Sequence, residues 1–248
     1  MRVFKDISYC DIGHSRQVLD LHLPDREEFS VFIYFHGGGI EAGSKEQKFI
    51  EALVNKGVAV VAANYRMYPS AVFPEFVRDA AAAVAWTYKH INEYGKCSKF
   101  FVGGSSAGGY LSMMLCFNKA YLAPYKIDPA QIDGFIHDAG QPTTHFNVLR
   151  ERGMDSRRVI IDEAAPLYYI GQDPEYAPML FIVSDNDMAN RYEQTMLVLS
   201  TLKHFRYDQS KIELKVMNGT HCHYINKQDE HGNFIFADII CDYIRSRS

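Results

Sequence analysis

The stretch Lys99–Gly109 reads KFFVGGSSAGG, and it is the strongest indication of the fold in the sequence. It begins as a short β-rich run, and a helical pattern follows Ala107, so Gly104–Gly108 (GSSAG) fits G-x-S-x-G at a strand-to-helix turn. Glycines two positions before and after the serine let strand and helix approach closely, while the serine oxygen projects from the turn. Only Ser106 has glycines at both positions, so we predict Ser106, and not the adjacent Ser105, as a nucleophile.

Short β-rich runs alternate with longer helical patterns on both sides of this motif. Several runs are apolar throughout, which indicates strands covered on both faces, as in a mostly parallel sheet. The alternation favours right-handed crossovers and a three-layer α/β/α sandwich. The run Val18–Pro24 alternates in polarity, so we expect it in an antiparallel hairpin at the sheet edge. The other predicted strands are Val31–Phe35, Val58–Ala63, Lys99–Val102, Ile132–Ile136, Met179–Val183 and Ile212–Met217, and the predicted helices are Pro74–Tyr94, Ala107–Lys119, Asn190–Phe205 and Asn233–Arg247.

Length and composition are typical of a globular enzyme-sized domain. The 248 residues suit one α/β domain over residues 1–248, and 47% hydrophobic with 23% charged residues is near the globular average. With a net charge of −4, the chain has no surplus of positive charge for binding nucleic acid or an anionic membrane. The five cysteines are scattered without a CxxC pair, and no signal peptide or membrane span is evident, so we expect a cytoplasmic location. No feature of the sequence indicates an oligomeric state.

The segment Pro142–Tyr176 interrupts the alternation between two predicted core strands. An insertion at this place lies over the carboxyl ends of the strands, where ligands bind in open α/β sheets. We therefore expect a small lid rather than a second domain. His137 and Asp138 follow the predicted strand Ile132–Ile136, and we consider them candidates for contact with a substrate at the cleft edge. The charged residues of the lid include Arg150, Glu151, Arg152, Arg157 and Arg158.

Three consecutive glycines follow a predicted strand in the run His36–Gly39 (HGGG). Glycines expose backbone N–H groups, and acyl transfer needs such donors to stabilise the oxyanion that develops on the carbonyl. We assign the oxyanion hole to the amides of Gly38, Gly39 and Ala107. We expect the side chain of His36 to anchor the loop rather than act as an acid or base. The two glycine motifs are about 70 residues apart and belong together in one kind of catalytic site.

Together these motifs resemble the hormone-sensitive-lipase-like, acetyl esterase and feruloyl esterase-type (BD-FAE-like) families. The resemblance runs from about Val18 to Tyr224. Larger members have a long N-terminal cap before HGGG, whereas 35 residues precede His36 here, so the compact esterases are the closer relatives. The resemblance implies an α/β-hydrolase fold, carboxylic ester hydrolysis and no cofactor. The residues that carry it are His36–Gly39, Asn64–Pro69, Phe73, Pro74, Asp79, Trp86 and Gly104–Gly109.

The acid of such a site follows a late strand, because the chain order in this fold is Ser, then Asp or Glu, then His. The run Ser184–Met188 (SDNDM) contains two aspartates. The acid of the family usually lies four positions along a turn that begins with a small residue, which points to Asp187. Asp185 is the alternative, and its other role is to cap backbone amides of the turn.

The base is expected after the last strand, in the run Asn218–Tyr224 (NGTHCHY). His221 fits best, because the glycine of the loop lies two residues before it, and His223 is the alternative. The His-x-His pattern also suggests a metal site, but the third ligand and second shell of a hydrolytic zinc site are not evident. We therefore predict neither a metal nor a cofactor.

The sequence thus predicts a serine esterase that acts on short-chain carboxylic esters through an acyl-enzyme, with a small-molecule ester as its partner. One alternative is a C–N hydrolase of the arylformamidase type. Another is a non-catalytic small-molecule-binding protein of the same fold, against which the presence of Ser106, Asp187 and His221 together argues.

Overall fold

An eight-stranded sheet lies at the centre of the computed structural model, which describes residues 1–11 and 13–247. The strands are β1 (Arg2–Ser8), β2 (Val18–Leu23), β3 (Glu28–Phe35), β4 (Val58–Ala63), β5 (Lys96–Ser105), β6 (Gly134–Asp138), β7 (Met179–Ser184) and β8 (Ile212–Met217). Their order in the sheet is β1-β2-β4-β3-β5-β6-β7-β8. The strands from β4 to β8 in this order are parallel, whereas β2 pairs antiparallel with both β1 and β4.

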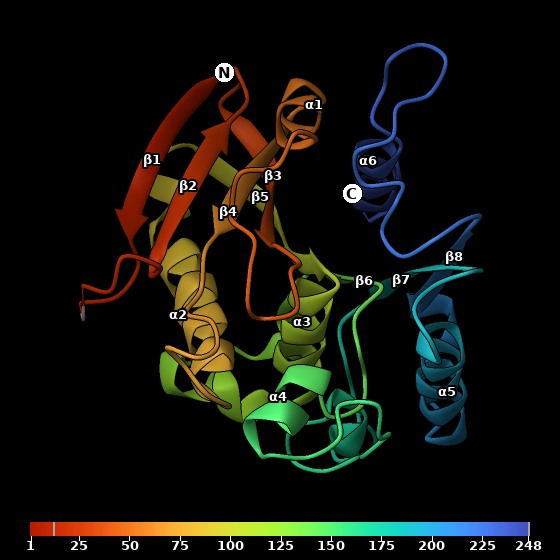
Figure 1. Ribbon diagram of the computed structural model, residues 1–248. Helices are drawn as coiled ribbons and strands as arrows, with labels where there is room; N and C mark the ends of the chain where they lie inside the picture. The colour runs from red at the N-terminus through yellow and green to blue at the C-terminus, as the bar shows by residue number, and fades with distance from the viewer. Residues whose placement is uncertain (12, 248) are drawn as a thin grey trace.

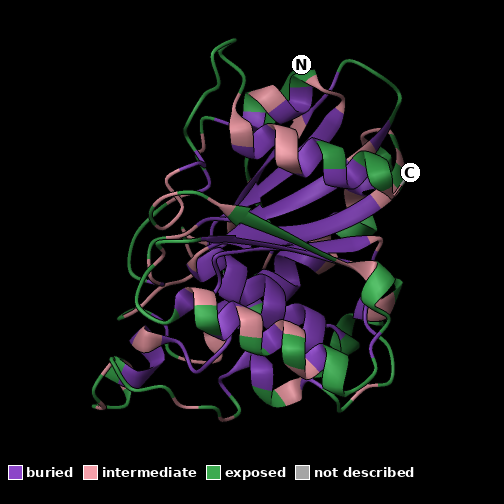
Figure 2. Ribbon diagram, turned by 90° about the vertical axis from the view of Figure 1, so that its right-hand side faces the viewer, coloured by how far each residue is buried: buried purple, intermediate pink, exposed green. Residues whose placement is uncertain are grey.

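Helices cover both faces of the sheet. The helices are α1 (Ile50–Asn55), α2 (Glu75–His90), α3 (Ala107–Phe117), α4 (Phe146–Glu151), α5 (Arg191–His204) and α6 (Ile235–Ser246). Helices α1 and α6 lie on one face and α2, α3 and α5 on the other (Figure 1). Figure 2 shows the resulting three layers, with the strands buried between the helices.

The strand β3 shows why the core runs are apolar at every position. Its successive side chains point to opposite faces of the sheet. Val31, Ile33 and Phe35 pack in the core beneath α2 and α3, while Phe32 and Tyr34 pack in the second core beneath α1 and α6. Burying each such side chain contributes about 1.5–3 kcal/mol, so both faces favour apolar residues.

The predicted three-layer sandwich and its mostly parallel sheet are confirmed. The six predicted strands from Val31–Phe35 to Ile212–Met217 and all four predicted helices are present, with boundaries that agree to within a few residues. The strand β5 extends three residues beyond its predicted bounds at each end, and β6 is shifted by two residues and begins at Gly134, after a 3-10 turn over Pro129–Gln131. The expected hairpin is formed by β1 and β2 at the sheet edge.

Three elements were not predicted from the sequence. The edge strand β1 is exposed at six of its seven positions, so it lacks the apolar pattern of the core strands. The helices α1 and α4 are six residues each, which is too short for a helical period to stand out. Within the described part of the chain, no helix is both long enough and apolar enough to cross a bilayer.

The strand order opens a ligand site between the ends of β3 and β5. The chain leaves β3 through α1 on one face to reach β4, and leaves β5 through α3 on the other face to reach β6. Because the two connections go to opposite faces, the carboxyl ends of these neighbouring strands form the crevice in which ligands bind. Phe35 pairs with Gly104 at this end, so HGGG and G-x-S-x-G start side by side.

Glycines allow the start of α3 to approach the end of β3 closely. A Cβ atom added to Gly108 would lie 1.9 Å from the carbonyl oxygen of Phe35, and one added to Gly104 would lie 2.5 Å from the same oxygen. These distances are far below van der Waals contact, and the neighbouring atoms belong to the backbone. Larger residues at either position would therefore separate the strand from the helix.

We predict that Gly108→Ala lowers the free energy of unfolding by about 2 kcal/mol or more, although alanine is the better helix former. The reason is the steric conflict with Phe35, and urea denaturation is the measurement. Gly232→Ala is the control, because Gly232 has φ +82° with no heavy atom near its missing Cβ. It incurs only the backbone strain, about 1 kcal/mol. Equal losses in the two variants would contradict the proposed contact.

Candidate active site

Ser106 lies at the sharp turn between β5 and α3. Its backbone has φ 56° and ψ −113°, a left-handed conformation that costs a non-glycine residue free energy. The N–H of Ser106 donates to the carbonyl oxygen of Asp138 at 2.7 Å, which fixes the turn against β6. The strained turn raises the serine side chain out of the sheet, and Ser106 is partly exposed, whereas Ser105 is buried.

His221 lies between Ser106 and Asp187. Its Nε2 is 2.8 Å from the Ser106 Oγ, and its Nδ1 is 2.5 Å from the Asp187 Oδ1. A carboxylate can only accept, so Nδ1 carries the proton and Nε2 accepts from the serine hydroxyl. The Asp187 side chain is fully buried, and that of His221 is 22% exposed, so a substrate can reach the histidine but not the aspartate.

The surroundings of Asp187 keep it ionised. Burial alone raises the pKa of a carboxyl group, yet the pKa of Asp187 lies below its usual value. The hydrogen bond and charge of His221 outweigh the burial, and the backbone N–H groups of Ser184 and Met188 also donate to the carboxylate. An ionised Asp187 can therefore orient the imidazole and stabilise its protonated form.

The two alternative residues have other partners. Asp185 accepts hydrogen bonds from the Gly219 N–H at 2.8 Å and the Asn218 side chain at 2.9 Å, and these bonds hold the pKa of its carboxyl below the usual value. The Nδ1 of His223 donates to the carbonyl of Thr220 at 2.9 Å. Asp185 thus joins the loop after β7 to the loop after β8, while the structure brings Asp187 and His221 to Ser106.

The HGGG loop passes beside Ser106. A Cβ atom added to Gly37 would lie 3.2 Å from the Ser106 Cβ. Gly38 and Gly39 have φ values of +111° and +65°, so their peptides adopt orientations that other residues rarely reach. Within residues 1–11 and 13–247, the amides of Gly38, Gly39 and Ala107 donate to no other group. Three free donors next to a serine oxygen are suited to binding an anion.

His36 holds this loop in place. Its ring stacks on Tyr65 with 4.5 Å between ring centroids, its Nδ1 donates to the Gly37 carbonyl at 2.7 Å, and its Nε2 accepts from Arg16 at 2.9 Å. Burial lowers the pKa of His36 to about 4, so it is neutral at neutral pH. With both ring nitrogens occupied, the side chain has the geometry of an anchor.

The segment Pro142–Tyr176 contacts the HGGG loop through α4. The Asn147 side chain donates to the Gly39 carbonyl at 2.9 Å, and the Phe146 ring packs on Gly39. Arg150 forms an ion pair with Glu41, which contributes little because both side chains are partly solvated. Two further arginines of this segment also pair within the chain, Arg152 with Asp162 and Glu163, and Arg157 with Asp155.

The expectation that His137 and Asp138 contact a substrate is wrong. Both side chains are buried, 1% and 0% exposed, because β6 has strands on both sides and helices over both faces. The His137 ring packs among three phenylalanines, and burial lowers its pKa to about 3. Asp138 instead accepts a hydrogen bond from the buried hydroxyl of Tyr224.

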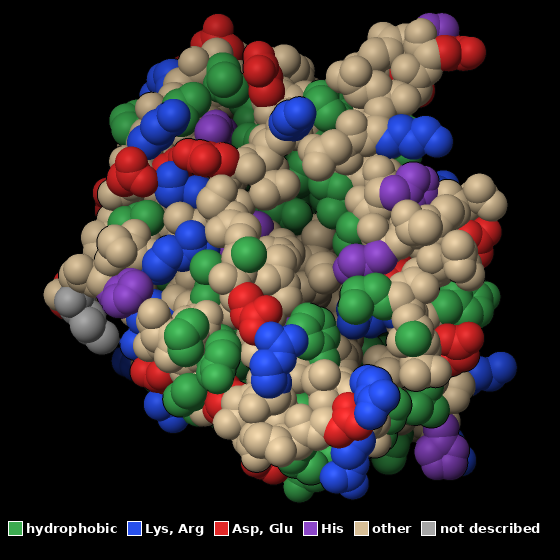
Figure 3. Space-filling view, in the orientation of Figure 1, with side chains coloured by type: hydrophobic (Ala, Val, Ile, Leu, Met, Phe, Trp, Pro, Cys, Tyr) green, Lys and Arg blue, Asp and Glu red, His purple; other side chains and the backbone are tan. Residues whose placement is uncertain are grey.

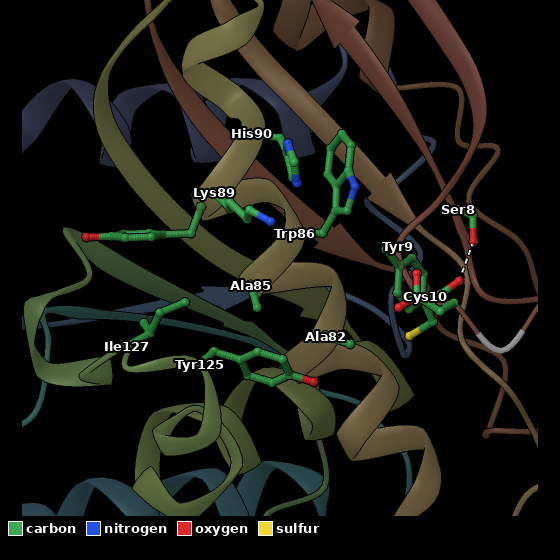
Figure 4. A pocket seen from close by; sticks show the side chains of 12 residues that line it. Ser8, Tyr9, Cys10, Ala82, Ala85, Trp86, Lys89, His90, Tyr125 and Ile127 are labelled. Atoms are coloured by element: carbon green, nitrogen blue, oxygen red, sulfur yellow. Dashed lines mark hydrogen bonds between the residues drawn. The ribbon is translucent and has the colours of Figure 1, made fainter.

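The space-filling view shows a hollow near the centre of the face on which α3 begins (Figure 3). Hydrophobic side chains are visible inside it, and histidines lie at its rim. A separate cavity of about 720 Å³ lies on the flank of the molecule, between α2 and residues 8–11. Trp86 and Tyr125 line that cavity, and none of the predicted site residues do (Figure 4). In the described residues, no group of three or more His, Cys, Asp or Glu is arranged to hold a metal ion.

Comparisons with known proteins show similarity to esterases. Residues 19–123 match the BD-FAE family model. The chain has the α/β-hydrolase fold. The predicted resemblance to BD-FAE-like esterases is therefore confirmed over these residues, which are part of the Val18–Tyr224 span that we expected.

Curated relatives match less than half of the sequence in the two following examples. Esterase LipI of Mycobacterium tuberculosis is 32% identical over 96 residues, which are 37% of this chain and 30% of LipI. Carboxylic ester hydrolase LipN of the same organism is 31% identical over 109 residues, which are 41% of this chain and 28% of LipN. The chain thus spans less than a third of the length of these two relatives.

Solved structures match over nearly the whole chain. A truncated carbohydrate esterase from gut microbiota has a TM-score of 0.78 at 17% identity, covering 100% of this chain and 96% of that one. The butyrate-bound esterase Est2 of Thermogutta terrifontis has a TM-score of 0.76 at 20% identity, covering 98% and 93%. At such identities the similarity establishes the fold.

We predict a proton NMR signal far downfield for the Nδ1–H of His221, because a short hydrogen bond to a buried carboxylate deshields its proton. Asp187→Asn removes the charge and should shift this signal upfield or abolish it. Asp185→Asn is the matched control and should leave it in place. The measurement uses protein with 15N-labelled histidine in water. A signal that depends on Asp185 instead would overturn the described pairing.

Proposed function

We propose that this chain is a carboxylic ester hydrolase in which Ser106 is the nucleophile, His221 the base and Asp187 the acid. The observation that carries the proposal is the placement of His221, with one ring nitrogen 2.8 Å from the serine oxygen and the other 2.5 Å from a buried carboxylate. The 2.8 Å distance between Nε2 and the serine oxygen lies within the range needed for proton transfer between a nucleophile and its base.

In the first half of the proposed reaction, Ser106 attacks the carbonyl carbon of the ester. Its proton moves to Nε2 of His221, and the carbonyl oxygen becomes an oxyanion. The imidazolium then gives that proton to the alcohol oxygen as the carbon–oxygen bond breaks. The products are the free alcohol and an acyl group bound to Ser106.

In the second half, water replaces the alcohol. His221 takes a proton from the water, whose oxygen attacks the acyl-enzyme carbonyl and forms a second tetrahedral oxyanion. Collapse of this intermediate returns the proton to the Ser106 oxygen and releases the carboxylic acid. Atoms and charges balance without an additional reactant, so the proposal includes neither a metal nor a cofactor.

The amides of Gly38, Gly39 and Ala107 are proposed to bind both oxyanions. Two observations support this role. The three amides have no acceptor within the described residues, and Gly37 lies close to Ser106. The amide of Ala107 is also the first of α3, so the partial positive charge of the helix start adds to the stabilisation. Removing one such donor typically costs about 10²–10³ in kcat.

For the substrate, we propose esters with a short acyl group. The exposed residues of the segment Pro142–Tyr176 between Arg150 and Glu163 are mostly charged or polar, with Val159 and Ile161 as the exposed apolar ones, so they form no broad apolar surface. A long acyl chain gains about 0.8 kcal/mol for each methylene that it buries, so a preference for long chains needs a continuous apolar channel. The structural relative Est2 was solved with butyrate, which is a short acyl product.

We predict that Ser106→Ala abolishes ester hydrolysis while the protein stays folded. The loss should be about 10⁴-fold or more in kcat, because no other group can form the acyl-enzyme. Ser105→Ala is the matched control and should keep most of the activity, since the Ser105 side chain is buried. The measurement is hydrolysis of p-nitrophenyl acetate, with circular dichroism to verify folding.

Activity of the folded Ser106→Ala variant near the wild-type level would rule out the proposed nucleophile. The same panel includes acetylated sugars and N-formylkynurenine, so that an amide-cleaving enzyme of the arylformamidase type is distinguished from an esterase. No turnover of any substrate by the wild-type protein would favour a binding protein instead.

We predict that kcat/KM for p-nitrophenyl esters is highest between acetate and butyrate. The value of kcat/KM should decrease for longer acyl chains, because their additional methylenes gain no apolar contact beyond the pocket. The series from acetate to palmitate provides the measurement. A maximum at eight or more carbons would mean that separated residues form an acyl channel, and the proposal for short esters would be wrong.

A further inference from the structure

Asp138, the last residue of β6, contacts two functional segments. Its backbone carbonyl accepts the N–H of Ser106 at 2.7 Å, so it fixes the turn that holds the nucleophile. Its side-chain Oδ1 accepts the hydroxyl of Tyr224, which lies three residues after His221. One residue therefore contacts both segments that carry the proposed reacting groups.

The side chains of this contact are fully buried. Asp138 and Tyr224 are both 0% exposed, and the Tyr224 ring packs near Phe236 of α6 with 6.1 Å between centroids. The second oxygen of Asp138 has no hydrogen-bond partner within the described residues. A buried carboxyl group without full satisfaction is costly, so its one hydrogen bond to Tyr224 is strongly favoured over the open arrangement.

The loop that carries His221 is held by separate contacts before and after the histidine. Residues 218–227 contain no regular helix or strand, and Cys222 has a positive φ of 55°. Ser184 donates to the Thr220 carbonyl at 2.8 Å, and Asp185 binds Gly219 and Asn218. These contacts hold the loop before His221, whereas after it Tyr224 and Ile225 are buried in the core, and Tyr224 adds a side-chain hydrogen bond to β6.

We propose that the hydrogen bond between Tyr224 and Asp138 positions His221 for catalysis by clamping its loop to the strand beside the nucleophile. Both are positioning residues, because neither touches the reacting atoms. The inference rests on the proposed function, and it adds to Ser106, His221 and Asp187 a pair of residues that determines the distance between base and nucleophile. A displacement of about 1 Å at such a distance can reduce the rate about 100-fold.

The clamp does not require a charge on Asp138. Burial raises the pKa of this carboxyl group to about 7, so both protonation states are populated near neutral pH. The Oδ1 atom accepts the tyrosine hydroxyl in either state, with the proton of the acid on the other oxygen. An asparagine oxygen can accept the same hydrogen bond, which provides a conservative variant for the test.

The experiment compares Tyr224→Phe, Asp138→Ala and their double variant in p-nitrophenyl acetate hydrolysis. We expect kcat to fall about 10- to 100-fold in each single variant with KM changed by less than about twofold, since binding is not affected. The kcat of the double variant should be no lower than that of the more impaired single variant, because both substitutions remove the same interaction. Asp138→Asn should restore kcat to within about threefold of wild type, because it keeps the acceptor.

Tyr207→Phe is the matched control. The Tyr207 hydroxyl is also buried and donates to the carbonyls of Tyr176 and Ala177, far from His221 along the chain. This variant should lose a similar free energy of unfolding and keep its kcat. Wild-type kcat in Tyr224→Phe, additive losses in the double variant, or an equal loss of kcat in Tyr207→Phe would each overturn the clamp. Because Ser106→Ala tests the nucleophile independently, these outcomes would leave the proposed function in place.

Discussion

The contact between the end of β3 and the first turn of α3 is the constraint on which the site depends. The backbone of Gly108 lies directly against the carbonyl of Phe35, and no residue with a Cβ fits there. This close approach accompanies the strained backbone of Ser106 and places the start of α3 beside the HGGG loop. The free energy that burial of both sheet faces provides is large enough to maintain this local strain.

Much of the architecture could be predicted from the sequence because the core strands are apolar on both faces. Val58–Ala63 and Ile212–Met217 were located to the residue, since turn residues bound them on both sides. The strand β1 and the short helices α1 and α4 were missed for the opposite reason. Their residues carry no periodic pattern, and contacts made after folding stabilise them instead.

The sequence was less informative about which polar groups meet. The sequence favours Asp187 over Asp185 and His221 over His223. In the structure, Asp187 and His221 are hydrogen-bonded in a chain with Ser106, whereas Asp185 and His223 each bind backbone groups of the loops. The sequence placed Asp138 at the cleft edge, because the end of a parallel strand usually faces a ligand. Alternation along the strand puts Asp138 on the same face as Ile136, but that a distant segment, the loop with Tyr224, covers this face is not recorded in any local pattern.

The attachment of α4 to the HGGG loop has a consequence for how a ligand binds. Asn147 holds the Gly39 carbonyl and Phe146 packs beneath the same residue, so the orientation of this peptide is determined before any substrate arrives. Freezing a flexible loop upon association costs conformational entropy, and a loop that is already fixed avoids that cost. Selectivity in such a preorganised site follows from complementarity to a rigid shape, and substitutions in α4 would act on recognition through increased loop entropy rather than through lost contacts with the ligand.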